Sequence, residues 1–257
     1  MDQVRFIFWE LLKILGVSFI SLLAVKSAAG LKPAAGNVLV SKLARARLWL
    51  NALILALVVF GAWNLGYDIA AEVYYRVALS DAQNSRPIKS YLNALQAVVL
   101  RPGVLRYWQA LESAKFTLGQ WQSIVDDGAA LKRVAGQDLE EVDAYRLAVS
   151  LFFLGRDDEA LRLVDGLIGQ NRFFLPPYIL KGHLLTAQRN YGEAERAFQA
   201  ALEVLPTDQG AVEGLAHAYF LEGNRQQALK VLADTSKFNF NREAQSRFEA
   251  LEGMYAQ

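Results

Sequence analysis

Apolar residues along the chain form two patterns, one continuous and one periodic. Residues 48–67 (LWLNALILALVVFGAWNLGY) contain no charged side chain. From about residue 70 onward, apolar residues recur at helical spacing between short turns rich in Gly, Asn, Asp and Pro, and no alternating strand pattern of useful length appears. The sequence therefore predicts an all-α protein with a membrane anchor at residues 1–67, comprising helices over 4–25 and 38–67, and a helical domain at residues 68–257.

Residues 48–67 are predicted to cross the bilayer. A helix of that length covers roughly 30 Å, which is the thickness of the hydrocarbon core. Ten of its residues are Leu, Ile, Val or Phe, and ten such residues favour insertion by about 3–6 kcal/mol. Trp49 at one end, and Trp63 and Tyr67 at the other, suit the two membrane interfaces. The alternative is a buried core helix, but core helices of this length normally keep a polar stripe.

The charges on either side of this span predict its orientation. Lys42, Arg45 and Arg47 precede the span, whereas Asp68 and Glu72 follow it. The positive-inside rule keeps the basic flank in the cytoplasm. The protein is therefore predicted to reside in the plasma (inner) membrane, with its helical domain extracytoplasmic and, in a Gram-negative cell, periplasmic.

The first apolar segment, residues 4–25, has two interpretations. It is long enough to span, but Glu10 and Lys13 interrupt it, three residues apart and able to pair. In one interpretation it forms a transmembrane hairpin with the second helix, whose connection at 26–47 holds five basic residues and no acidic one. In the other it lies in the membrane surface. A cleaved signal peptide is a third option, less favoured because a clean spanning helix follows.

The helical domain contains an internal repeat of 34 residues. Small or apolar residues recur at this interval in four sets: Ala148, Gly182 and Ala216; Ala160, Ala194 and Ala228; Leu151, Leu185 and Tyr219; Val164, Phe198 and Leu232. Gly155 and Gly223 occupy matching turn sites, where a left-handed residue is predicted to end a helix.

This pattern resembles the tetratricopeptide repeat (TPR), a helix–turn–helix of 34 residues. Residues 175–208 carry the family pattern best, through Tyr178, Gly182, Leu185, Tyr191, Ala194, Phe198, Ala201 and Pro206. Residues 141–174 and 209–236 match at most key sites but lack the closing Pro. Upstream, Trp108, Leu111 and LGQW at 118–121 form a degenerate repeat with about two extra residues after it. The resemblance implies a stack of about four to five helical pairs.

Two further features concern the ends of this domain. Residues 240–255 are predicted to form a capping helix, because Phe240, Ala244, Phe248 and Leu251 make one apolar stripe. At the other end, the helical pattern continues directly from the span, so the spanning helix is expected to run into the first helix of the stack. The span-then-repeat layout also has a loose similarity to the C-terminal part of O-antigen ligase and polymerase-type membrane proteins, without a specific motif.

The charge distribution agrees with an anchored protein. The net charge of +1 divides into +5 for residues 1–47, with seven basic and two acidic side chains, and −4 for residues 68–257, with twenty basic and twenty-four acidic. A nucleic-acid binder would carry its positive charge on the folded domain, so no nucleic-acid partner is predicted. The absence of Cys excludes disulfides, thiolate metal sites and a cysteine nucleophile.

The resemblance implies a candidate partner groove on the first helix of each pair. In this family, the residue after the small Gly or Ala and those three or four positions away tend to face the concave surface. Here these residues are Tyr145, Val149, Phe152, Ile179, His183, Thr186, Glu213, His217 and Phe220. Such an apolar groove favours an apolar helix or extended segment of a partner. The alternative is permanent filling by the chain itself or by a fixed partner.

The remaining polar residues suggest no catalytic, metal or cofactor site. His183 and His217 occupy equivalent sites one repeat apart, about 10 Å between helix axes, which is too far for most two-histidine metal sites. The acidic pairs at 126–127, 140–141 and 157–159 are interpreted as lying at turns or helix starts, where they compensate helix dipoles. No phosphate loop or nucleophile elbow appears.

The sequence therefore predicts a non-enzymatic, membrane-anchored scaffold, assembly factor or accessory subunit. Its predicted partners are subunits of a membrane protein complex and the lipid bilayer itself. The alternative hypothesis is an accessory protein of envelope polysaccharide or glycan synthesis, in which aromatic groove residues stack on sugars.

Overall fold

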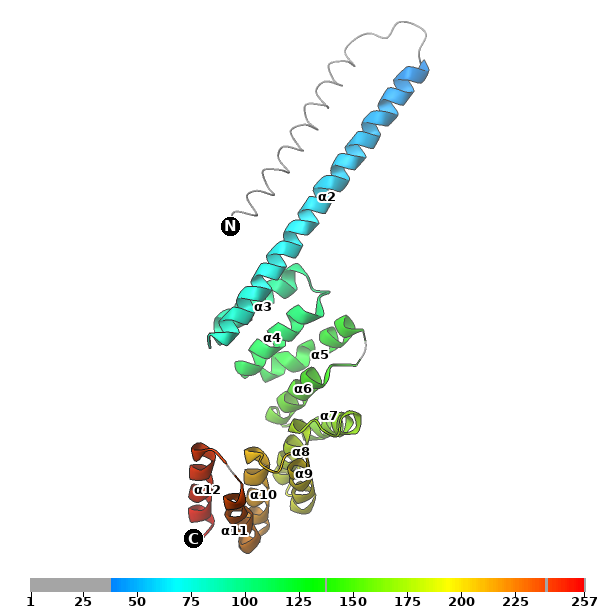
Figure 1. Cartoon of the computed structure of the whole chain (residues 1–257). Coiled ribbons are helices and arrows are strands. Elements are labelled where there is room, and N and C mark those ends of the chain that lie inside the picture. The colour runs from blue at the N-terminus through cyan, green and yellow to red at the C-terminus, as the bar shows by residue number, and fades with distance from the viewer. Residues whose placement is uncertain (1–37, 137, 239, 257) are drawn as a thin grey trace. The chain divides into compact units, whose positions relative to one another are not determined.

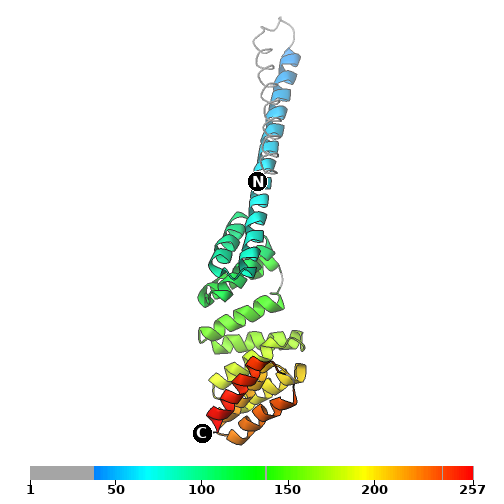
Figure 2. The same cartoon turned by 60° about the vertical axis from the view of Figure 1, so that its left-hand side comes forward.

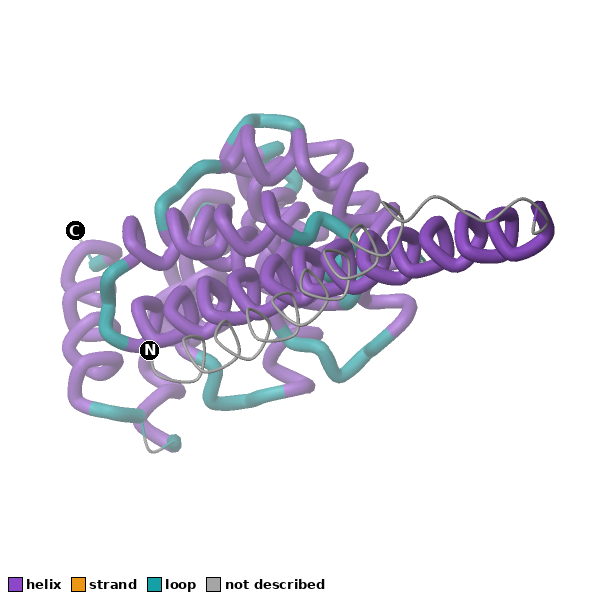
Figure 3. The backbone as a smooth tube through the Cα atoms, turned by 90° about the horizontal axis from the view of Figure 1, so that it is seen from above, coloured by secondary structure: helices purple, strands orange, loops and turns teal. Residues whose placement is uncertain are grey.

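The computed structural model describes residues 38–136, 138–238 and 240–256, and every regular element within these ranges is a helix (Figure 3). The predicted all-α class is therefore confirmed. The segment at residues 4–25 lies outside the described residues, so both interpretations of it stay predictions.

Helix α2 runs without interruption from Val38 to Gln83 (Figure 1). Its stretch Trp49–Gln83 is long and apolar enough to cross a membrane, and its apolar window is 0% buried. Trp49, Phe60 and Trp63 are 77%, 66% and 65% exposed. Soluble domains rarely expose a contiguous apolar surface of this size.

The chain divides into two compact units, residues 1–74 and residues 75–257. The last turns of α2 belong to the second unit. The sequence-based division between residues 67 and 68 lies inside α2, so the predicted anchor and the helical domain are joined by continuous helix.

The second unit is a stack of antiparallel helical pairs (Figures 1 and 2). Hydrogen bonds join the end of α2 to α3, and each later pair packs on the one before it. The helices that follow α2 are α3 (Pro87–Leu100), α4 (Leu105–Thr117), α5 (Trp121–Ala135), α6 (Glu141–Phe153), α7 (Asp157–Gln170), α8 (Pro176–Ala187), α9 (Tyr191–Val204), α10 (Gln209–Glu222), α11 (Arg225–Asp234), the short 3₁₀ helix η1 (Thr235–Lys237) and α12 (Arg242–Tyr255).

The turn inside every pair contains one residue in the left-handed backbone region. These residues are Ser85, Gly119, Gly155, Arg189 and Gly223, with φ of 55°, 67°, 71°, 61° and 93°. The predictions for Gly155 and Gly223 are confirmed. Successive turns are 34, 36, 34 and 34 residues apart, which identifies five pairs. The single interval of 36 contains the two extra residues predicted after the degenerate repeat, and they fall in the α5–α6 connection.

Phe198 of α9 fixes the spacing between neighbouring pairs. Its ring is fully buried between α8 and α10. A Cβ atom added at Gly182 of α8 would lie 2.5 Å from this ring, and one added at Gly214 of α10 would overlap the same ring. The two glycines therefore let the helices close on Phe198 from both sides. The repeat pattern identified Gly182, whereas Gly214 lies outside the family's key positions.

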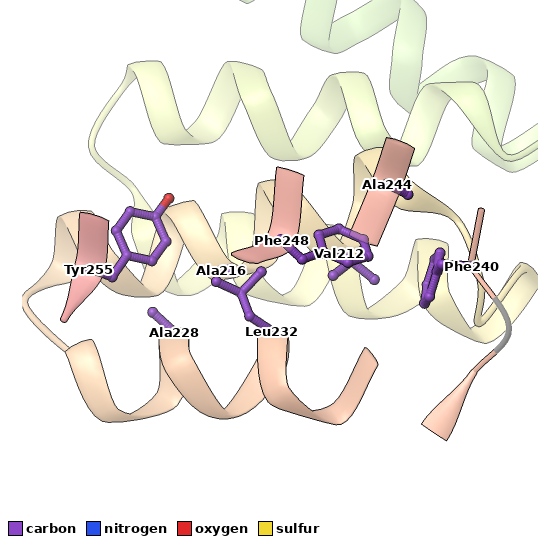
Figure 4. Close-up of a cluster of buried hydrophobic side chains, with 8 residues drawn as sticks. All are labelled: Val212, Ala216, Ala228, Leu232, Phe240, Ala244, Phe248 and Tyr255. Carbon is purple, nitrogen blue, oxygen red and sulfur yellow. The ribbon is translucent and has the colours of Figure 1, made fainter. Parts of the chain in front are cut away.

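The C-terminal end of the stack is closed by α12. Tyr255 and Phe248 are almost fully buried with Leu232 of α11 and Val212 of α10 in one apolar cluster (Figure 4). The Asn241 side chain caps α12 by accepting a hydrogen bond of 2.8 Å from the backbone N–H of Ala244. The opposite face of α12 is mostly polar, and Arg247 pairs there with Glu243 at 3.0 Å.

Arg189 provides a test of the turn geometry. It occupies the left-handed site that Gly fills in three other pairs, and that region costs a non-Gly residue about 1–2 kcal/mol. Arg189→Gly is therefore expected to stabilise the second unit by up to about 1 kcal/mol, after the larger unfolded-state entropy of Gly is subtracted. Urea unfolding of the full chain in detergent, followed by circular dichroism, measures the shift.

Arg196→Gly is the matched control for this substitution. Arg196 is exposed inside α9, where Gly costs about 1 kcal/mol of helix stability. The unfolding midpoint should therefore rise for Arg189→Gly and fall for Arg196→Gly. A lower midpoint for both variants would contradict the left-handed assignment of Arg189.

Candidate functional site

The predicted partner residues lie on a row formed by the first helix of each pair. Helices α4, α6, α8, α10 and α12 contact one another in succession, and we call them the first-helix row. Among the described residues, the second helices α5, α7, α9 and α11 make no contacts of similar extent with one another. Helices that approach more closely lie on the inside of a curved stack, so the first-helix row forms its inner side.

The three predicted residues of α6 pack largely into the interior. Val149 is buried in a cluster with residues of α7 and α8, and Tyr145 and Phe152 pack against this cluster as half-buried side chains. The Tyr145 ring contacts Phe174 edge-on at 5.9 Å between centroids. Burial raises the pKa of the Tyr145 hydroxyl. This part of the row is therefore filled mainly by the chain itself.

In α8, His183 is the predicted residue that remains most available. Its side chain is exposed, and its ring contacts Phe198 edge-on at 5.2 Å. The surrounding protein nevertheless desolvates the imidazole and lowers its pKa, and the charge of His217 adds to this effect. On a concave surface a ring can be accessible to solvent and still be surrounded by protein atoms that reduce its hydration. Ile179 is half-buried, and the Thr186 hydroxyl donates to the Gly182 carbonyl at 2.8 Å.

In α10, two of the three predicted residues contact the C-terminal helix. The ring of Phe220 stacks on Tyr255 of α12 at 4.3 Å, and His217 Nδ1 lies 3.3 Å from the Tyr255 hydroxyl. Glu213 accepts a hydrogen bond of 2.7 Å from Gln209. Burial, with a smaller contribution from the charge of Glu213, raises the pKa of Tyr255. The chain's own cap therefore occupies this end of the row, and sequence reasoning missed Tyr255.

An aromatic patch of four residues lies where α4 and α6 end. Its members are Phe116, Trp121, Phe152 and Phe153. The Phe153 ring stacks on Trp121 at 4.5 Å with an interplanar angle of 10°, and Phe116 contacts Trp121 edge-on at 5.3 Å. Phe153 is 57% exposed. Of these four residues only Phe152 was predicted to face the groove, although LGQW at 118–121 marks the turn that places Trp121.

A pocket of about 330 Å³ lies between the end of α2, the start of α3 and α4. Small side chains line it, together with Leu79. Leu79 and Ser113 each precede their left-handed turn residue by six positions, as do Val149, His183 and His217. The pocket therefore lies at the same register of the repeat as the predicted groove. Its volume is at the lower end of the range for ligand pockets and would take one bulky side chain.

A buried ionic cluster joins α4 to α5. Lys115 Nζ lies 3.1 Å from the Glu112 carboxylate and also pairs with Asp127. Glu112 and Lys115 are 2% and 3% exposed. Burial raises the pKa of Glu112 to about 7, against the opposing effect of Lys115. Burial alone would lower the pKa of Lys115, but its two carboxylate partners outweigh it and the pKa is raised. Neither group has access to a substrate.

This cluster corrects one interpretation of the acidic pairs. Residues 157–159 lie in the first turn of α7, and residues 140–141 lie at the start of α6, as predicted. Residues 126–127 instead lie in the middle of α5. Asp127 therefore balances the buried charge of Lys115 and compensates no helix dipole. Within the described residues, no three His, Cys, Asp or Glu side chains form a metal-binding group.

Residues 185–251 match the family model described as tetratricopeptide repeat. This match supports the tetratricopeptide resemblance over the last pairs of the stack. No curated protein matches the chain significantly.

Several solved structures share the helical fold of much of this chain. MamA (41-end) from Desulfovibrio magneticus RS-1 matches with a TM-score of 0.59 at 13% identity, over 65% of this chain and 94% of that chain. YrrB, described as a TPR protein with an unusual peptide-binding site, matches with a TM-score of 0.53 at 16% identity, over 69% and 90%. The pilF protein of Pseudomonas aeruginosa matches with a TM-score of 0.56 at 12% identity, over 74% and 90%. Identities this low show the fold alone, which is a TPR-type α-solenoid.

The ionic cluster predicts a pH-dependent stability. The pKa of Glu112 is raised from 4.5 to about 7, so between these values the folded state holds a proton that the unfolded state has lost. Its contribution to stability is therefore complete below pH 4.5 and lost as the pH rises through about 7. The Glu112→Gln variant lacks this titratable group. The stability of the variant relative to that of the natural chain should therefore rise as the pH increases from 4.5 to about 7.

Urea unfolding midpoints on both sides of this window measure the effect. Glu249→Gln is the matched control, because Glu249 is exposed on α12. The difference between the natural chain and Glu249→Gln should stay constant with pH. A constant difference for Glu112→Gln as well would show that Glu112 is charged throughout.

Proposed function

We propose that this protein is a membrane-anchored scaffold that acts as an assembly factor or accessory subunit of a membrane complex. The observation that carries the proposal is a TPR-type solenoid whose inner row exposes mainly apolar and aromatic surface. The buried charges of Glu112 and Lys115 are inaccessible to a substrate. The apolar window within Trp49–Gln83, which is 0% buried, supports the anchor.

The partner surface is proposed to comprise the aromatic patch and the pocket beside α4. Together they offer the exposed ring of Phe153 and a slot lined by small side chains and Leu79. His183 would form the continuation of this surface, whereas Phe220 and Tyr255 already pack on each other. An apolar helix or extended segment with one bulky side chain fits this arrangement. Exposed aromatic rings are frequent anchors of protein interfaces.

The anchor is proposed to place the solenoid outside the cytoplasm, in the periplasm of a Gram-negative cell. Support comes from the basic residues Lys42, Arg45 and Arg47 before the span and from Asp68 and Glu72 after it. Trp63 and Tyr67 contact each other edge-on at 5.6 Å, and such a pair suits the proposed outer interface of the span.

Photocrosslinking in native membranes tests the scaffold. A photoreactive phenylalanine analogue at Phe153 should give an adduct with one membrane protein that also co-purifies stoichiometrically in mild detergent. Phe173 provides the matched control, since it is 70% exposed in the loop between α7 and α8, away from the patch. Phe153→Ala, but not Phe173→Ala, should release the partner because the aromatic anchor is lost.

Two results would count against the scaffold. Equal recovery of the partner with both Ala variants would remove the patch from the interface. Adducts with a saccharide or a glycan-synthesis enzyme would favour the alternative, an accessory role in envelope polysaccharide synthesis.

A reporter fused after Gln257 tests the orientation separately. A reporter that is active only outside the cytoplasm should be active in this fusion. Reversing the flank with Lys42→Glu, Arg45→Glu and Arg47→Glu should reduce that activity, because the basic residues would no longer retain the flank in the cytoplasm. Activity of a cytoplasm-specific reporter at the same position would overturn the proposed orientation.

A further inference from the structure

Helix α3 exposes several large apolar side chains. Its buried residues are the small Ser90, Ala94 and Ala97, together with Val98. Three of its six large aliphatic residues face outward, with Ile88, Leu92 and Val99 exposed by 65%, 53% and 64%. These three residues lie at positions i, i+4 and i+11, which is one face of a helix. We call them the α3 stripe.

No other second helix of the stack shares this property within the described residues. The outward positions of α7 and α9 are mostly charged or polar, with Arg162 and Asp165 on α7 and Arg196 and Glu203 on α9. An apolar outer face on a solvent-exposed helix marks an interaction surface. The α3 stripe therefore needs a specific occupant.

The local charge indicates which occupant fits. Residues 75–111 hold five basic side chains and one acidic one, a net of +4, whereas residues 112–257 hold fifteen basic and twenty-one acidic, a net of −6. Lys89 is exposed on α3 itself. Apolar side chains beside excess positive charge are the features by which interfacial helices bind anionic lipid.

The covalent chain keeps this region close to a membrane. Only seven residues separate Tyr67, at the end of the predicted span, from Tyr75 at the start of the second unit. Because these residues are helical, Tyr75 lies about 12 Å along α2 from Tyr67. The Ser90 hydroxyl of α3 donates to the Ala78 carbonyl at 2.9 Å, and Asn93 donates to Asp81 at 3.0 Å. Helix α3 is thus held to residues that directly follow the tether, which raises the effective concentration of the bilayer surface at the stripe.

We propose that the α3 stripe docks on the surface of the bilayer, with Ile88, Leu92 and Val99 entering the interface and Lys89 facing anionic lipid headgroups. This inference rests on the proposed anchoring by α2. It adds a second membrane contact, which would fix the orientation of the solenoid toward the membrane.

Single-cysteine variants test the docking, because the natural chain has no Cys. A fluorescent probe is attached at Leu92→Cys in α3, at Leu57→Cys in the span, or at Gln226→Cys on the exposed face of α11. The full chain is reconstituted in nanodiscs of phosphatidylcholine and phosphatidylglycerol with brominated acyl chains. The probes at residues 57 and 92 should lose fluorescence by contact with bromine, and the probe at residue 226 should not.

A matched pair of charge reversals tests the role of the headgroups. Lys89→Glu should reduce quenching of the probe at residue 92, and so should replacing phosphatidylglycerol with neutral lipid. Lys230→Glu, at an exposed position of α11, should leave that quenching unchanged. None of these changes should affect the probe at residue 57.

The outcomes separate the two proposals. Quenching at residue 57 without quenching at residue 92 would overturn the docking and leave the anchor intact. No quenching at either site would overturn the anchor, and the docking with it. If the probe at residue 92 were shielded from aqueous iodide but not quenched by brominated lipid, a protein surface would cover the stripe and the docking would again be wrong.

Discussion

The structure depends on one packing constraint, which is that a single helical pair cannot bury its own apolar face. Phe198 shows how the constraint is met, since its ring projects from one pair and is enclosed by Gly182 and Gly214 from two successive first helices. Each glycine removes the Cβ atom that would hold the helices apart. Because interiors are close-packed, this single ring fixes how far apart two helices lie, and the same requirement repeats along the stack.

That packing also determines which chemistry the inner row can offer. Several side chains of the row are already committed, since the Thr186 hydroxyl bonds to its own helix and Phe220 stacks on Tyr255. The strongly shifted carboxyl of Glu112 is enclosed with Lys115, which also pairs with Asp127 of α5, and burial of this cluster has a cost in desolvation. What remains accessible is mostly ring surface, an imidazole and a small pocket. Such a surface recognises shape and apolar groups.

The sequence predicted those parts of the fold in which one residue type recurs at the same structural position of each repeat. Gly155 and Gly223 identified their turns because Gly is favoured in the left-handed region. Ser85 and Arg189 adopt that conformation without Gly, so residue type alone did not identify the first pair. Asp127 was misinterpreted because its partner Lys115 lies on the preceding helix, and a charge seen only against its sequence neighbours carries no information about such a partner.

The candidate site was harder to predict for a related reason. Positions such as Val149, His183 and His217 follow from the repeat register, but whether a side chain is available depends on what packs over it. The C-terminal helix contributes Tyr255 outside the repeat, and α5 contributes Trp121 from the turn rather than from the first-helix row. Neither contact follows from a 34-residue period.

The two ends of the stack meet the requirement for closure in different ways. Terminal repeats of a solenoid need a face that tolerates water. At the C-terminal end, α12 covers the last pair and turns Arg247 and Glu243 outward. At the N-terminal end, α3 turns Ile88, Leu92 and Val99 outward. A capping helix that faces water would expose polar side chains there instead. The first pair therefore lacks the polar outer face of the last one, and a bilayer to which the chain is already tethered would supply the closing apolar contact.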